Sequence, residues 1–191
     1  MKNRTSKIAV GSLIVAVVVV SLFFLRSASE AQLLRPKVPY IQHNVCPFEC
    51  CQYGRWISKS LLKAYKLEGD DSTVVFIIEP GEEFTAIGGN VHIMKLGEIV
   101  LNKSFDEFTE GDKIYILSYR GEGFYDLWYK GKVLDSTEEV WSNGVLIESP
   151  EFVWWVSIKN KAGEQGWLRL KNISESGFQM EYEIDGMDSC S

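Results

Sequence analysis

Beyond Val38, short runs of β-branched and aromatic residues alternate with glycines and charged residues. Such runs are typical of β-strands, and no long segment with a helical period separates them. The pattern predicts a mostly β domain that closes into a small barrel or a sandwich. The predicted strands are 74–78, 84–87, 91–94, 98–101, 113–119, 124–129, 152–159 and a strand that begins at Gly166.

Two short segments carry local predictions. Gly88-Gly89-Asn90 suits the positive φ angles of a tight hairpin, which would join strands 84–87 and 91–94. Within 58–65, leucines and a tyrosine stand at helical spacing, so one or two helical turns are expected there.

Composition divides the chain into three parts. Residues 1–31 are a targeting segment, and residues 38–172 form the β domain. The polar stretch 135–143 is a long loop or a seam inside that domain. Residues 173–191 are expected to form a last strand, at 178–184, and a flexible tail.

The amino-terminal segment predicts export. Lys2, Arg4 and Lys7 precede an uncharged apolar stretch of 18 residues, 8–25, which Arg26 closes. This length lies between the apolar region of a cleavable signal and a membrane-spanning helix. We therefore expect an extracytoplasmic protein, in the periplasm or cell envelope. It is either anchored in the membrane by a transmembrane helix or secreted after signal cleavage.

Charge argues against nucleic acid as a partner. The formal net charge is −6, and without residues 1–31 there are 16 basic against 25 acidic side chains. A phosphate backbone would be repelled by this body, which has no basic cluster. Aromatic residues make up 13% of the chain and include six tryptophans, which suits a compact β module with large side chains in a small core.

Four cysteines lie in the part that would be exported, so disulfides are expected. Cys46 and Cys51 enclose a loop short enough for one bridge, whereas the adjacent Cys50 and Cys51 cannot easily pair. This leaves Cys50 to reach Cys190 near the carboxyl end. The cysteines lack the paired Cys-x-x-Cys spacing of zinc sites. Neither a metal nor a cofactor is therefore expected.

No group of residues in the sequence clearly indicates a catalytic site. Cysteine catalysis would need a base, and the chain holds two histidines, His43 and His92. Glu49 and Glu122 would have to converge in a cleft to work as acid and base, and their spacing does not indicate this. We expect a protein that is not an enzyme.

The stretch 152–169 is the most specific motif. An alternating strand is followed by a polar turn containing Gly163 and then by Gly166-Trp167-Leu168. This order resembles the end of bacterial SH3 domains, often labelled SH3b. The resemblance implies an SH3-like small barrel, elaborated or two-lobed, and the apolar stretch 8–25 would place one N-terminal hydrophobic helix before it. In such a barrel Gly166 would permit close backbone approach and Trp167 would pack inside.

A second stretch consists of three elements: Cys46-Pro47-Phe48-Glu49-Cys50-Cys51-Gln52-Tyr53-Gly54-Arg55-Trp56, then Gly111-Asp112, then Gly121-Glu122-Gly123-Phe124 with Trp128-Tyr129-Lys130-Gly131. It is similar to a group of exported bacterial SH3-domain-containing proteins of uncharacterised function. Together the two likenesses cover about residues 38–171. In that group the position of Cys50 is usually glycine, so the thiol here departs from the pattern.

The resemblance implies a non-enzymatic binding module, because SH3 barrels lay peptides or wall fragments across aromatic residues in a shallow groove. The expected partners are an envelope protein, a peptide or a cell-wall glycopeptide. Two alternatives stay open: a thiol-active protein or enzyme that uses Cys50 or Cys51, and a purely structural envelope domain. The expected ligand-binding residues are Tyr53, Tyr119, Glu122, Tyr125, Trp128 and Tyr129.

Overall fold

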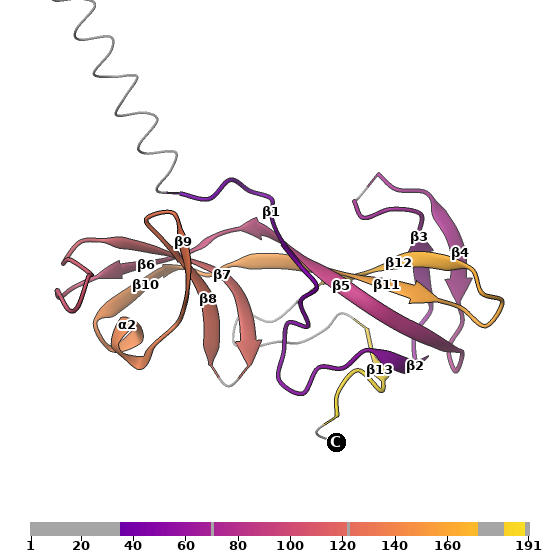
Figure 1. Ribbon diagram of the computed structural model, residues 1–191. Helices are drawn as coiled ribbons and strands as arrows, with labels where there is room; N and C mark the ends of the chain where they lie inside the picture. The colour runs from indigo at the N-terminus through magenta and orange to yellow at the C-terminus, as the bar shows by residue number, and fades with distance from the viewer. Residues whose placement is uncertain (1–34, 70, 122, 172–181, 190–191) are drawn as a thin grey trace, which may run out of the picture.

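The computed structural model describes residues 35–69, 71–121, 123–171 and 182–189, and these residues are mostly β (Figure 1). They form two antiparallel sheets and one short helix. The larger sheet contains β1 (Tyr40–His43), β2 (Gly54–Ser58), β3 (Leu62–Tyr65), β4 (Val74–Ile78), β5 (Glu83–Lys95), β11 (Glu151–Lys159), β12 (Gln165–Lys171) and β13 (Ile184–Asp185). The smaller sheet contains β6 (Gly97–Leu101), β7 (Lys113–Gly121), β8 (Phe124–Tyr129), β9 (Lys132–Asp135) and β10 (Gly144–Glu148).

Strand β5 organises the larger sheet, whose order is β13-β2-β5-β11-β12-β3-β4. One edge of β5 is shared by two strands: β2 pairs with its first part and β1 with its second part. The other edge pairs with β11 along almost its whole length. β5 and β11 therefore form the long axis of the molecule, as Figure 1 shows.

The smaller sheet is inserted in the chain between β5 and β11, in the order β10-β6-β7-β8-β9. Helix α2 (Glu138–Ser142) joins β9 to β10 in this sheet. Thr137 caps the helix by accepting a hydrogen bond from the Val140 N–H through its side chain, and Val140 itself is buried. The polar stretch 135–143 is thus a connection within the smaller sheet.

Two apolar cores result, and β7 belongs to both. Tyr115 and Leu117 of β7 pack into the first core, which also holds the fully buried Trp56 and Trp154. Ile114 and Ile116 project to the other side and pack into the second core. Because successive side chains of a strand point to opposite faces, a strand with an unbroken apolar run can separate two cores.

Most predicted strands are confirmed, including 74–78 and 124–129 with the same bounds. The predicted hairpin at Gly88-Gly89-Asn90 is wrong, because these residues lie inside the unbroken strand β5. A Cβ atom at residue 89 would stand 2.8 Å from the Trp155 carbonyl oxygen and 2.9 Å from the Tyr53 hydroxyl oxygen. Glycine is needed here for close packing and not for a turn.

The predicted helical turns within 58–65 are also wrong, since 62–65 form strand β3. Leu62 and Ala64 are buried in the first core, whereas Leu61 is 48% exposed. The buried residues therefore alternate with period two, and pairing with β12 and β4 outweighs the local helical spacing.

The two residues of the Gly166-Trp167 motif have different outcomes. Gly166 permits a close approach as expected, because a Cβ there would stand 3.1 Å from the Ala64 Cβ and from the Tyr65 carbonyl oxygen. Trp167 does not pack inside: it is half-buried on the outer face of β12, and Leu168 points into the core. The period of two decides this, because Leu168 and Trp167 cannot share a face.

Several predictions lie outside the described residues: the targeting segment 1–31, Glu122, residues 172–181 and Cys190. Among the residues that the structure describes, no helix has the length and apolar content that crossing a membrane requires.

A candidate binding site at the junction of the two sheets

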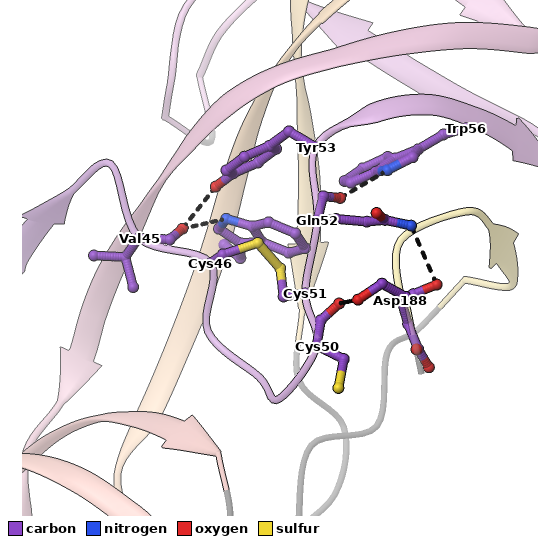
Figure 2. Close-up of a disulfide and its surroundings, with 10 residues drawn as sticks. Val45, Cys46, Cys50, Cys51, Gln52, Tyr53, Trp56 and Asp188 are labelled. Atoms are coloured by element: carbon purple, nitrogen blue, oxygen red, sulfur yellow. Dashed lines mark hydrogen bonds between the residues drawn. A yellow bond between two sulfur atoms is a disulfide. The ribbon is translucent and has the colours of Figure 1, made fainter. Parts of the chain in front are cut away.

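The disulfide loop is the first wall of the candidate site. Cys46 and Cys51 form a disulfide with their Cα atoms 5.6 Å apart, which confirms the predicted bridge (Figure 2). No described cysteine is a free thiol. The pairing of Cys50 with Cys190 stays a prediction, because Cys190 is not among the described residues.

Three aromatic side chains hold the loop from the side of the first core. The Val45 carbonyl oxygen accepts hydrogen bonds from the Tyr53 hydroxyl at 2.8 Å and from Trp154 Nε1 at 3.1 Å (Figure 2). Trp56 Nε1 donates to the Gln52 carbonyl oxygen at 3.1 Å. Burial raises the pKa of Tyr53, against a lowering by its side-chain hydrogen bond with Trp154. The polar atoms of these side chains therefore fix the loop backbone by hydrogen bonds to its carbonyl oxygens.

The carboxyl-terminal segment holds the loop from its other side. Gln52 N–H donates to the Met187 carbonyl oxygen at 2.8 Å, and Ser189 N–H donates to the Cys50 carbonyl oxygen at 2.9 Å. Gln52 Nε2 donates to the Asp188 carbonyl oxygen at 3.3 Å (Figure 2). Cys50 has a φ of 56°, a conformation that favours glycine.

Gly121 at the end of β7 and Phe124 at the start of β8 form the second wall. Gly121 is buried with a φ of +123°, and a Cβ atom on it would stand 3.1 Å from the Cα of Glu49. Gly121 therefore packs directly on the backbone of the disulfide loop. Two sequence elements that are 72 positions apart meet at this contact.

Between these walls lies a hollow of about 540 Å³, which we call the junction hollow. Phe48 stands in it edge-on to Trp154, with ring centroids 5.8 Å apart, and Phe124 opposite the loop is 51% exposed. The residues that line the junction hollow are Phe48, Glu49, Cys50, Cys51, Arg120, Gly121, Phe124, Asp135 and Ser136.

A chain of polar contacts links the junction hollow to both sheets. Arg120 forms ion pairs with Asp135 of β9 and, at 3.4 Å, with Asp126 of β8. Asp126 in turn accepts a hydrogen bond from Gln42 Nε2 of β1 at 2.5 Å. The guanidinium is thus held between two carboxylates, one of which is largely buried.

The residues that the sequence suggested as ligand contacts do not form one surface. Tyr53 packs in the first core and holds the loop, and Tyr129 is 6% exposed with its hydroxyl donating to Asp112. Trp128 packs edge-on against Tyr40 at 5.8 Å.

The remaining suggested residues lie elsewhere. Tyr119 and Tyr125 are neighbours at 5.1 Å, and Tyr125 also contacts Trp141 at 5.3 Å. Glu122 is not described. The binding role of these aromatics stays a prediction.

The sequence did not indicate that four further residues line one hollow: Phe48, Arg120, Phe124 and Asp135. Phe48 lies in the cysteine-rich motif and Phe124 in the glycine-rich motif that the sequence analysis singled out, so these motifs were the available signal. Their proximity could not be inferred, because it depends on how the smaller sheet sits on the larger one.

Neither family models, nor curated proteins, nor solved structures give a match to this chain. Within the described ranges, no three histidine, cysteine or acidic side chains are grouped so that they could hold a metal ion.

Proposed function

We propose that this protein is a non-enzymatic binding module of the cell envelope, and that the junction hollow holds its ligand. The ligand would be a peptide, a cell-wall glycopeptide or a segment of an envelope protein. The observation that carries this proposal is the junction hollow itself, where the disulfide loop meets the end of β7. Its volume of about 540 Å³ is in the usual range of ligand sites, about 300 to 1,000 Å³.

The composition of the junction hollow supports binding. Ligand sites commonly combine aromatic surface with a few fixed polar groups. Phe48 and Phe124 supply the aromatic surface, and Arg120, with its two carboxylate partners, supplies the fixed polar group. The disulfide restrains one wall, which lowers the entropy that the site would lose on binding.

The proposal includes the SH3-like class and the extracytoplasmic location. Support for the class comes from the antiparallel strands that enclose two small cores and from the close approach at Gly166. Support for the location comes from the positively charged, apolar amino terminus and from the Cys46–Cys51 disulfide, which suits an oxidising compartment. The thiol-active alternative has no comparable support, because no described cysteine is a free thiol.

Retention of envelope components on the immobilised full chain, in detergent, tests the proposal. Phe124→Ala should weaken retention at least about fivefold, since exposed aromatic anchors carry much of the energy of binding. Leu146→Ala is the matched control, because Leu146 is also 51% exposed and does not line the junction hollow. Equal retention by all three proteins, or none by the wild type, would refute the proposed function.

A further inference from the structure

We infer that the group which enters the junction hollow is an alkylammonium side chain of the lysine type, carried by an extended peptide. This inference rests on the proposed function and specifies its ligand. It follows from the rings, the carboxylates and the charge balance at the junction hollow.

The two phenylalanines suit the alkyl chain and its charged end. Phe48 is held by its edge-on contact with Trp154, and Phe124 has half of its surface free. A lysine-type side chain lays its methylene groups along apolar surface and keeps its ammonium group in water. An ammonium group near an aromatic ring is also attracted by the negative face of that ring.

The carboxylates of the junction hollow supply the opposite charge. Glu49 is exposed on the disulfide loop, and the side chain of Asp135 is 77% exposed at the end of β9. Both can approach a cation without leaving water, so the cost of desolvation is small. Asp135 forms an ion pair with Arg120. No ion pair of Glu49 is found among the described residues.

Arg120 does not make the net charge at the junction hollow positive. It is the one cation among the described lining residues, and its guanidinium contacts two carboxylates, Asp126 and Asp135. The lining of the junction hollow and the partners of Arg120 together supply three carboxylates, Glu49, Asp126 and Asp135, against one guanidinium. The strongly acidic body beyond residue 31 adds a field that attracts cations and repels anionic ligands.

Binding of three capped pentapeptides to the oxidised full-length protein tests this inference. All are polyalanine except at the centre, which holds lysine, norleucine or glutamate. Norleucine keeps the alkyl chain and removes the ammonium group. The lysine peptide should bind about five- to tenfold more tightly than the norleucine peptide at low salt, which is the combined size of an exposed ion pair and a cation–π contact.

Two variants place the effect at the junction hollow. Glu49→Gln and Phe124→Ala should each remove most of the preference for lysine, whereas Glu110→Gln, an exposed carboxylate in the β6–β7 connection, should leave it unchanged. Near-ultraviolet circular dichroism checks that each variant keeps the wild-type fold.

The outcomes separate this inference from the proposed function. Equal affinity for lysine and norleucine, tighter binding of glutamate, or a lysine preference that survives Glu49→Gln would each overturn the inference. If the retention of envelope components still depends on Phe124, the proposed function stands without it. If neither the lysine preference nor the dependence of retention on Phe124 is observed, both the inference and the proposed function are refuted.

Discussion

The backbone of Glu49 lies against Gly121, so close that a side chain at residue 121 would press on the Glu49 Cα from 3.1 Å. Through this contact the disulfide loop of the larger sheet supports the end of β7 in the smaller one. Gln42 and Asp126 add a second link between the sheets, a hydrogen bond of 2.5 Å. The junction hollow exists because these contacts set the sheets at a defined distance.

Gly121→Ala should destabilise the protein by about 2 to 3 kcal/mol, because it adds both a strained φ and an overpacked contact. Gly69→Ala is the matched control: its φ is +126°, close to the +123° of Gly121, but a Cβ there meets nothing within 4 Å. The control should lose only about 1 kcal/mol. Urea unfolding measures both values, and equal losses would show that the Glu49 contact contributes nothing.

Tyr53→Phe removes one of two donors to the Val45 carbonyl oxygen and should cost about 1 kcal/mol. Because Trp154 still donates, the oxygen is not left without a partner. Burial raises the pKa of Tyr53, so the native state holds this proton more firmly than the unfolded chain. Its stabilising effect is present below the ordinary tyrosine pKa near 10 and is lost as the pH rises through the native pKa.

Unfolding of the wild type should therefore become easier above about pH 10, and Tyr53→Phe should reduce this alkaline dependence. Denaturant midpoints between pH 8 and 11 provide the measurement. Identical slopes for the two proteins would contradict the role of Tyr53.

Glu68 joins the β3–β4 connection to β5, because its two carboxylate oxygens accept from Asn90 Nδ2 at 2.6 Å and contact His92 Nε2 at 2.5 Å. The His92 ring also lies beside Trp155, with centroids 6.3 Å apart. In a double-mutant cycle, Glu68→Gln and His92→Phe should show a coupling of about 0.5 to 1.5 kcal/mol.

The same variants should speed amide hydrogen exchange in the 66–69 and 71–73 backbone and leave β6–β7 unaffected. If exchange changed equally in both sheets, Glu68 would act on global stability alone and would not anchor this connection.

Asp112 should contribute to acid sensitivity. Burial tends to raise its pKa, but hydrogen bonds from Tyr129, the Thr109 N–H and Lys130 outweigh it, so the net pKa lies below the usual value. The stabilisation is present above the unfolded-state pKa near 3.9 and disappears as the pH falls through the lower native pKa.

Asp112→Asn should lower stability at pH 7 by about 1 to 2 kcal/mol and flatten the pH dependence below about pH 4. Asp71→Asn, in an exposed turn, serves as the control and should retain the wild-type profile. Thermal unfolding from pH 2 to 7 tests this, and a variant profile as steep as that of the wild type would count against Asp112.

Local patterns sufficed to predict a mostly β chain and one disulfide bond. The runs of β-branched and aromatic residues along 113–119 and 152–159 predict strands, because these residue types are enriched in strands. Cys46 and Cys51 could be paired from the shortness of their loop. These features depend on neighbours in the chain.

The tertiary structure decided the rest, because the deciding partners are distant in sequence. Gly88-Gly89-Asn90 suits a turn and a close approach equally well, and only the backbone of β11 and the Tyr53 hydroxyl determine which one forms. Trp167 points outward because Leu168 takes the core side of β12. The junction hollow arises only when Glu49 meets Gly121, since it lies between two sheets whose packing no local pattern specifies.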